Sequence, residues 1–320
     1  MLPAAILILQ LGSLSPPIPQ AEADLAQSLR AEQPAACPAS GLAVQVLGSG
    51  GPVAEAPRAG TSYLVRVDGR PRLLIDIGSG AYLRFAEAGG NVTELDAILL
   101  THLHADHSGD LVSVLMSGGF EDRTEPLPVI GPDAAPRFPA TSDFLSGLFD
   151  PDRGPYAYLG GYLDGSEDKP LLAPRDVATD NGDGAPVTLM LGHGLTVTAL
   201  PVHHGAAPAL GYRVDYGGKS VVITGDQSAF SDGFETALAG SGPQLLFAHF
   251  VIPPGPGQPR ALHRPPDAIG ELAAKLGARR LVLTHNMNRS LARLGDGLAA
   301  IRQSYAGPVT VAYDLDCYAP

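Results

Sequence analysis

Short apolar segments alternate with Gly- and Pro-rich turns through most of this 320-residue chain. Segments of four to eight aliphatic and β-branched residues bounded by turn residues are typical of strands. We therefore expect a mixed sheet to begin near residue 42, from the closely spaced segments LAVQVLG, SYLVRV and RLLIDIG. The next segment, SGAYLRFAEAG, has helical spacing, and DAILLTH indicates a further buried strand.

An irregular stretch interrupts this pattern. Before it, we expect a helix near Leu111 to Met116, a short strand at LPVIG and a helix over SDFLSGLF. Residues 150–186 are rich in Gly, Pro, Asp and Tyr and show little periodicity, which predicts a long loop or a cap inserted over a site. The tyrosines of this stretch either contact substrate or only hold the loop in place; they are Tyr156, Tyr158 and Tyr162.

The pattern after residue 186 predicts a second sheet with its own helices. Strand-like segments come first, VTLML, LTVTALPV, GYRVDY and KSVVITGD, and helices and strands then alternate to the end of the chain. Two groups of strands, each flanked by helices, indicate an α/β fold with two layers packed sheet to sheet and a site at the sheet edges.

The N-terminus carries an apolar run, MLPAAILILQLGSL, followed by the small-x-small pattern at residues 21–23. We expect a signal peptide over residues 1–23, a leader or linker over residues 24–40 and a single domain over residues 41–320, in a periplasmic or secreted protein. The run is too short for stable membrane insertion. No Lys or Arg precedes it, which leaves a cytoplasmic protein with a disordered leader as the alternative.

Composition limits the partners and the compartment. The net charge is −12, so the chain lacks the overall positive charge expected of a nucleic-acid-binding protein. The two cysteines, Cys37 and Cys317, form a disulfide if the protein is exported, and are free thiols if it is cytosolic.

The run HxHxDH concentrates four residues that can bind metal ions. His102 and His104 are two positions apart, so both point to one side of an extended backbone and can chelate one ion. Asp106 and His107 are then available for a second ion. Because the run follows an apolar strand and precedes a helix, it lies on a loop where α/β enzymes often place their chemistry.

Further donors follow other predicted strands: His204, Asp226 and His285. A carboxylate between two cations can bridge them, and a water between the same ions becomes a hydroxide nucleophile near neutral pH. His203 adjoins His204, which we favour as the ligand, with His203 in a supporting or exposed position. His193 lies in a Gly-flanked turn and is expected to be exposed, and His249 either lines the pocket or is a buried histidine with hydrogen-bond partners.

Taken in order, these residues resemble the metallo-β-lactamase superfamily, and more narrowly its branch of ribonuclease Z, arylsulfatases and cyclic-nucleotide phosphodiesterases. The resemblance rests on the segments LGSGGP, LLIDIGSG, THLHADHSGD, HGAAPALGYRV, ITGD and LTH. It implies a four-layer αββα sandwich and two divalent metal ions, usually zinc, with manganese or iron as alternatives. It also implies that one metal is held by His102, His104 and His204, the other by Asp106, His107 and His285, with Asp226 bridging and Asp76 supporting the ligands.

His263 matches a histidine that, in the ribonuclease Z-like branch, protonates a leaving oxygen or binds phosphate. This chain departs from that pattern because Arg264, Pro265 and Pro266 follow it, where the branch has small hydroxyl residues. A loop histidine at a helix start is the alternative.

The sequence thus predicts an exported binuclear hydrolase of phosphodiester or related ester bonds, in which a metal-bridging hydroxide attacks and Asp106 and His263 act catalytically. Arylsulfatase and lactonase activities are alternatives, as is a metal-binding protein without catalysis. We expect a small-molecule ester substrate and no tRNA, because the surface is acidic and the branch's basic arm has no counterpart here. Homo-oligomer formation is left open.

Overall fold

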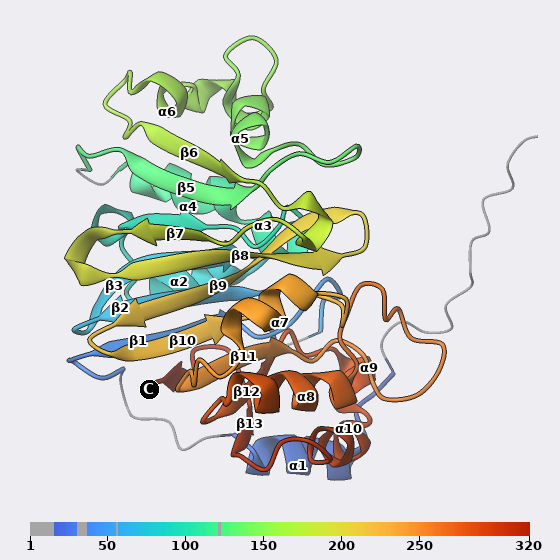
Figure 1. Ribbon diagram of the computed structural model, residues 1–320. Helices are drawn as coiled ribbons and strands as arrows, with labels where there is room; N and C mark the ends of the chain where they lie inside the picture. The colour runs from blue at the N-terminus through green and yellow to red at the C-terminus, as the bar shows by residue number, and fades with distance from the viewer. Residues whose placement is uncertain (1–15, 31–36, 56, 121–122) are drawn as a thin grey trace, which may run out of the picture.

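The computed structural model describes residues 16–30, 37–55, 57–120 and 123–320, and its strands form two stacked sheets of seven strands each (Figure 1). In order across the first sheet, the strands are β14 (Cys317–Tyr318), β1 (Leu42–Gly48), β2 (Ser62–Val67), β3 (Arg70–Ile77), β4 (Ala97–Leu99), β5 (Leu127–Pro132) and β6 (Leu172–Val177). Across the second, they are β13 (Val309–Val311), β12 (Leu281–Thr284), β11 (Leu245–His249), β10 (Lys219–Ile223), β9 (Ala207–Tyr216), β8 (Thr196–His204) and β7 (Val187–Met190).

Alternating residues of each strand supply two different cores. In β3, Leu73 and Ile75 point between the sheets, whereas Leu74 points to the helices outside. The rings of Tyr63 and Phe247 meet edge to face across the space between the sheets, 5.7 Å apart. Strands that are apolar on both faces need cover on both sides, which explains why their sequences read as continuous apolar runs.

Helices cover the outer face of each sheet and complete the predicted αββα layers (Figure 1). The helices packed on the first sheet are α2 (Ala81–Glu87), α4 (Leu111–Gly118), α5 (Thr141–Phe149) and α6 (Gly161–Asp164). Those on the second are α7 (Asp232–Leu238), α8 (Pro266–Leu276) and α10 (Leu294–Ile301), with α1 (Gln20–Ser28) packed on α10. Two further short helices, α3 (Ala105–Ser108) and α9 (Asn288–Leu291), lie in loops after β4 and β12.

Strand directions place the candidate site at one edge. Strands β3 to β6 are parallel to one another, and so are β10 to β13. The carboxyl ends of parallel strands lie together, so the loops after β4, β10 and β12 converge at the same edge of the sandwich. These loops carry the predicted metal-binding residues except His204, which is the last residue of β8.

The 150–186 stretch is more regular than the sequence indicates. It contains a 3₁₀ turn at Ala157–Leu159, helix α6 and strand β6, which pairs with β5 as the edge strand of the first sheet. A proline and two exposed charges interrupt the apolar pattern of β6, at Pro174, Arg175 and Asp176. Edge strands tolerate such residues, and they also prevent edge-to-edge pairing, so periodicity alone could not reveal this strand.

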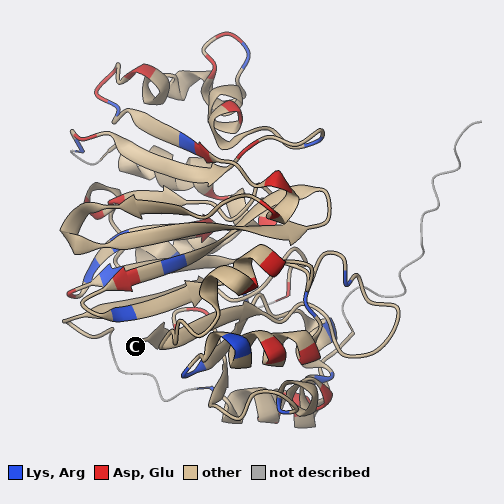
Figure 2. Ribbon diagram, viewed as in Figure 1, with Lys and Arg blue, Asp and Glu red and all other residues tan. Residues whose placement is uncertain are grey.

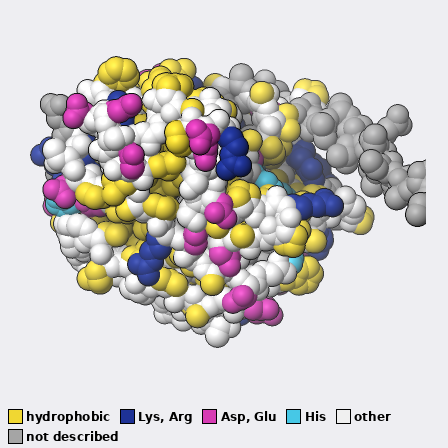
Figure 3. Space-filling view, turned by 90° about the horizontal axis from the view of Figure 1, so that it is seen from above, with side chains coloured by type: hydrophobic (Ala, Val, Ile, Leu, Met, Phe, Trp, Pro, Cys, Tyr) yellow, Lys and Arg dark blue, Asp and Glu magenta, His cyan; other side chains and the backbone are white. Residues whose placement is uncertain are grey.

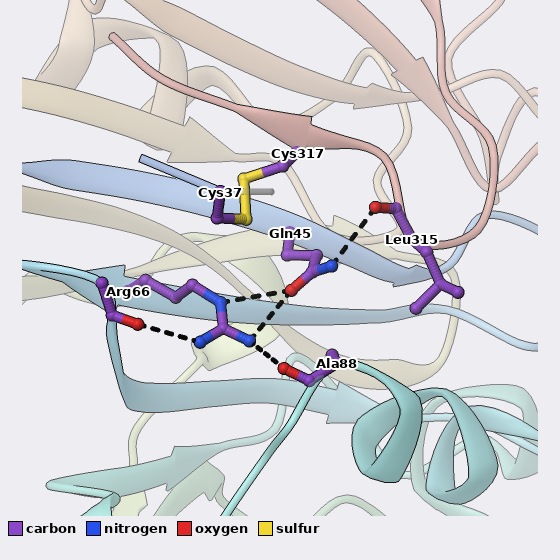
Figure 4. Close-up of a disulfide and its surroundings, with 7 residues drawn as sticks. Cys37, Gln45, Arg66, Ala88, Leu315 and Cys317 are labelled. Atoms are coloured by element: carbon purple, nitrogen blue, oxygen red, sulfur yellow. Dashed lines mark hydrogen bonds between the residues drawn. A yellow bond between two sulfur atoms is a disulfide. The ribbon is translucent and has the colours of Figure 1, made fainter. Parts of the chain in front are cut away.

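The N-terminal segment is tied to the second half of the molecule. Cys37 and Cys317 form a disulfide beside β1, where Gln45 links the Arg66 guanidinium to the Leu315 carbonyl (Figure 4). Helix α1 spans the expected boundary between residues 23 and 24, and its Glu22 accepts a hydrogen bond from the Gly295 amide. The apolar run of the expected signal peptide lies outside the described residues. Among the described helices, none combines the length and apolar character needed to cross a bilayer.

The last strands of the chain belong to different sheets, and the segment VTVAYDLD, residues 309–316, leads from one to the other. It forms β13 in the second sheet, then turns at Tyr313–Asp316, and β14 pairs with β1 in the first sheet. The chain end therefore joins the two sheets.

Candidate metal centre

The structure gathers the predicted metal-binding residues into one buried cluster at the shared sheet edge. The cluster comprises His102, His104, Asp106, His107, His204, Asp226 and His285, together with His249 and His263. Their nitrogen and carboxylate oxygen atoms form overlapping groups of three in which all atoms lie within 4.8 Å of one another. Such convergence of imidazole and carboxylate groups matches the donor set of divalent metals.

Three histidines make the first group. His102 Nε2 lies 2.9 Å from His104 Nδ1, and His204 Nε2 lies 3.4 Å from the same atom. The other nitrogen of His204, Nδ1, lies 2.8 Å from the Leu262 carbonyl oxygen and donates to it, which turns Nε2 toward the other two histidines. Burial, and then the neighbouring histidines, lower the pKa of His102 well below its ordinary value, which favours neutral rings able to bind a cation.

The second group contains a carboxylate and two histidines. His285 Nε2 lies 3.2 Å from Asp106 Oδ2, and His107 Nε2 lies 3.5 Å from the same oxygen. Burial would raise the pKa of Asp106, but hydrogen bonding to His285 and the charge of His107 lower it to about 2. Asp106 is therefore ionised at neutral pH.

Asp76 fixes the orientation of His107. Its Oδ2 lies 2.7 Å from His107 Nδ1, and it accepts hydrogen bonds of 2.7 Å from both the amide and the hydroxyl of Thr101. Burial would lower the pKa of His107, but Asp76 raises it to about 9. With Nδ1 held by Asp76, Nε2 of His107 points into the cluster, which is the arrangement of a carboxylate–histidine pair behind a metal.

Asp226 lies between the two groups. Its Oδ2 is 3.6 Å from His204 Nε2 and 3.8 Å from His107 Nε2, and its Oδ1 is 3.4 Å from His285 Nε2. Burial opposes its ionisation, but the surrounding histidines, first His285 and then His263, hold the pKa of Asp226 well below its usual range. One carboxylate thus faces both groups.

The hydrogen-bond inventory tests whether these residues fit a metal. Nε2 of His107 and both ring nitrogens of His285 are buried and lack a well-formed hydrogen bond among the described residues. Buried polar atoms nearly always have partners, and an unpaired one costs about 1–3 kcal/mol. A cation bound by the Nε2 atoms of His107 and His285 would remove that cost for these two atoms, so the donor set fits a divalent metal.

His249 is the residue for which sequence reasoning left the role open. It ends β11, and its Nδ1 lies 2.7 Å from Asp226 Oδ1. Its Nε2 lies 2.9 Å from the hydroxyl of Tyr63, which in turn lies 2.7 Å from the hydroxyl of Thr284. Burial lowers the pKa of His249 to about 4, so the neutral ring donates from Nδ1 and accepts from Tyr63 at Nε2. A buried chain from three strands therefore orients Asp226.

His263 joins the cluster at its outer side. Its Nδ1 lies 3.7 Å from Asp226 Oδ2, is buried and has no hydrogen-bond partner among the described residues. Burial lowers the pKa of His263 to about 3, so its ring is neutral at neutral pH. The following residue, Arg264, is buried and bonded to Gln227 and Glu235, which anchors the loop that carries His263.

Two glycines of the predicted motifs make room for this cluster. A Cβ on Gly51 would lie 2.3 Å from the ring of His285, and one on Gly78 would lie 2.1 Å from the Asp106 carbonyl oxygen. These contacts explain why LGSGGP and LLIDIGSG need glycine at those positions.

Other histidines and tyrosines lie elsewhere. His203 is bonded to the Ser228 hydroxyl, and the exposed His193 pairs with Asp96, away from the cluster. Tyr162 is buried and donates to the Leu115 carbonyl, so it anchors the 150–186 stretch to α4.

Comparison with known proteins agrees with the geometry. Residues 56–285 match the family model of the metallo-β-lactamase superfamily. A ribonuclease Z of Mycobacterium avium (strain 104) is 31% identical over 286 residues, which cover 86% of this chain and 96% of that protein. The metallo-β-lactamase fold protein YhfI from Bacillus subtilis superposes with a TM-score of 0.64 at 22% identity, covering 87% of this chain and 98% of that one. The short form of human tRNase Z superposes with a TM-score of 0.63 at 20% identity and the same coverage.

These relatives overturn the predicted partners. The prediction of a small-molecule ester substrate and no tRNA is wrong, because the matching proteins are named ribonuclease Z and tRNase Z. The prediction rested on the acidic net charge and on the missing basic arm. Figure 2 shows basic and acidic residues interspersed along the chain. The face seen in Figure 3 likewise mixes hydrophobic, basic and acidic side chains. Net charge is an average over such a surface and says little about the charge of the part that contacts a substrate.

Proposed function

The chain belongs to the metallo-β-lactamase superfamily, and from that premise we propose that this metal-dependent hydrolase cleaves phosphodiester bonds of RNA at a two-metal centre. The observation that carries the proposal is the position of Asp226, whose carboxylate faces a group of three histidines on one side and the Asp106, His107 and His285 group on the other. A bridging carboxylate between two donor groups is what a two-metal site requires.

In this proposal the two donor groups hold one divalent ion each. Members of the superfamily typically bind zinc, and the imidazole-rich donor set suits zinc, with manganese or iron as alternatives. When bound, two such ions polarise a phosphoryl oxygen, lower the pKa of water and neutralise charge on the attacking and leaving oxygens. The proposed ligands are His102, His104 and His204 for one ion and Asp106, His107 and His285 for the other.

The side chains have distinct tasks in the reaction. Asp106 is ionised and partly exposed, so it accepts a hydrogen bond from the attacking water and orients it. His263 lies at the outer side of the cluster, and its neutral ring donates a hydrogen bond from its single N–H to the departing oxygen, which stabilises the charge there. Asp76 and the His249–Tyr63 pair act through the ligands that they orient.

RNA is proposed because the curated relatives that span most of this chain are named ribonuclease Z. Export is a separate proposal. It is supported by the N-terminal apolar run and by the Cys37–Cys317 disulfide, which is typical of oxidising compartments. Immunoblotting of cell fractions tests it: mature protein without residues 1–23 in the exported fraction is expected, and full-length protein confined to the cytoplasm contradicts it.

A substrate panel tests the activity. Metal-loaded enzyme is assayed on a 3′-extended tRNA precursor, bis(p-nitrophenyl) phosphate, an aryl sulfate, a lactone and a cephalosporin. We expect hydrolysis of the two phosphodiesters, abolished by Asp226→Ala and retained by Asp96→Ala, which removes a carboxylate paired with a histidine away from the cluster. Hydrolysis of only the sulfate, lactone or cephalosporin, or full activity of Asp226→Ala, contradicts the proposal.

A further inference from the structure

A short turn after β5 reaches the metal-binding cluster from the first sheet. Residues 133–140 connect the end of β5 to the start of α5 (Figure 1), and their Phe138 lies against His104 of the cluster. Within them, Ala135 and Phe138 exchange two backbone hydrogen bonds of 2.9 Å, with Pro136 and Arg137 between them. We call residues 135–138 the β5 turn.

The β5 turn is held in place at its base. Asp133 accepts hydrogen bonds from the amide and the hydroxyl of Thr179, at 3.1 and 2.7 Å, and its own amide donates to the Val177 carbonyl. On the other side, the Thr141 hydroxyl donates to the Pro132 carbonyl. These bonds connect the turn to β6 and α5, so it is a preorganised feature of the surface.

Phe138 lies against a proposed metal ligand and outside the core. Its ring centroid is 5.5 Å from that of His104, and the two rings are inclined by 60°. Phe138 is partly exposed and belongs to none of the hydrophobic clusters formed by the described residues. An aromatic ring that contributes little to the core but borders a reaction centre is suited to hold an apolar or aromatic part of a substrate.

Arg137 adds a positive charge at the tip of the same turn. It is exposed, and no ion pair links it to another described residue. No other Lys or Arg occurs between residues 124 and 152, so its charge stands alone in this part of an acidic chain. Guanidinium groups pair with phosphate oxygens, and a cation beside an aromatic ring is a common pair for binding single-stranded nucleic acid.

We propose that the β5 turn is a nucleotide-binding element of the active site: Phe138 stacks on the base next to the scissile phosphodiester, and Arg137 pairs with a neighbouring phosphate. The inference rests on the proposed phosphodiesterase function and adds the substrate contact that the metal-binding residues lack. Stacking accepts any base, so the turn supplies affinity for nucleotides without sequence preference.

Two chromogenic diesters with the same leaving group test the stacking. Thymidine 5′-(p-nitrophenyl phosphate) carries a base, and methyl p-nitrophenyl phosphate does not. For Phe138→Ala we expect kcat/KM to fall about tenfold on the thymidine diester, mainly through KM, and less than twofold on the methyl diester. Phe138→Trp should retain activity on both. The control Phe120→Ala removes an exposed aromatic residue just after the end of α4, and it should change neither.

Equal losses on both diesters for Phe138→Ala, or no loss on either, would overturn the proposal. A binding measurement tests the turn independently of hydrolysis. Fluorescence anisotropy measures the affinity for a labelled single-stranded phosphorothioate RNA. Arg137→Ala should weaken this binding and lower its salt dependence by about one charge. If the wild type hydrolyses neither diester, the proposed function fails. The turn is then judged by RNA binding alone, and equal binding by wild type, Phe138→Ala and Arg137→Ala contradicts it.

Discussion

Replacing Tyr63 with Phe tests the buried chain that orients Asp226. The hydroxyl of Tyr63 is its only polar side-chain atom, and it joins His249 Nε2 at 2.9 Å to Thr284 Oγ1 at 2.7 Å. Phe fills the same space, so the change removes these two hydrogen bonds and leaves the packing against Phe247 in place. His249 keeps its bond to Asp226 but loses the partner that fixes which ring nitrogen carries the proton.

The size of the effect follows from burial. Tyr63 is fully buried, and the change leaves His249 Nε2 and the Thr284 hydroxyl without their partner. An unsatisfied buried polar group costs about 1–3 kcal/mol, and the Thr284 hydroxyl can rotate, so we expect the free energy of unfolding to fall by about 2 kcal/mol. Loss of an outer-shell partner typically weakens metal binding by about 10- to 100-fold. Because the His249–Asp226 bond survives, we expect a loss near tenfold.

Urea unfolding of the metal-free protein and metal titration against a chelator measure the two effects separately. Tyr305→Phe is the matched control, because its buried hydroxyl donates to the Ala278 carbonyl at 3.2 Å, away from the metal-binding cluster. It should lose about 1 kcal/mol of stability and no metal affinity. If Tyr63→Phe also loses only stability and binds metal as the wild type does, the hydroxyl does not act on Asp226 and the reasoning is refuted.

Three further predictions address other parts of the molecule. Burial opposes the ionisation of Glu235, but Lys275 and Arg264 hold its pKa below the usual 4.5, so Glu235→Gln should lower stability at pH 7. The difference should shrink below pH 4.5, where this contribution is lost; a constant difference in pH-dependent urea unfolding would contradict this. Cys37→Ser should lower the free energy of unfolding by about 3 kcal/mol, and reduction of the wild type should have the same effect. Unaltered stability of either protein in thermal unfolding would contradict this. Gly51→Ala should weaken metal binding at least tenfold because its Cβ would meet His285, whereas Gly147→Ala, in open space, should not; equal titrations would refute the steric argument.

The layers and the metal-binding cluster could be predicted because each has a local signature. Buried strands appear as apolar runs, and residues such as Asp226 and His285 directly follow them, so their shared edge follows from parallel strand order. Strand β6 could not be predicted, because its pairing with β5 outweighs a sequence that contains Pro174 and two exposed charges. Strand β14 could not be predicted either, because it has only two residues and its partner, β1, is far away in the sequence.

The role of His249 could not be predicted from the spacing of residues in the sequence, because it depends on contacts made in the folded protein. His249 is the last residue of β11, and His285 directly follows β12. This similar position at the end of a strand was the sequence signal that pointed to His249. Its bond to Asp226 and its bond to Tyr63 join residues far apart in the sequence, so only the folded arrangement shows that it supports a ligand. The substrate prediction failed for a different reason: net charge is an average over the chain, whereas a substrate meets individual residues.

Anomalous diffraction tests the two-metal centre most directly. Crystals of the protein grown with zinc, measured on both sides of the zinc absorption edge, should show two zinc peaks per chain within the cluster. One peak should lie among His102, His104 and His204, the other among Asp106, His107 and His285, with Asp226 between them. A single peak, or zinc bound only outside these side chains, would contradict the account.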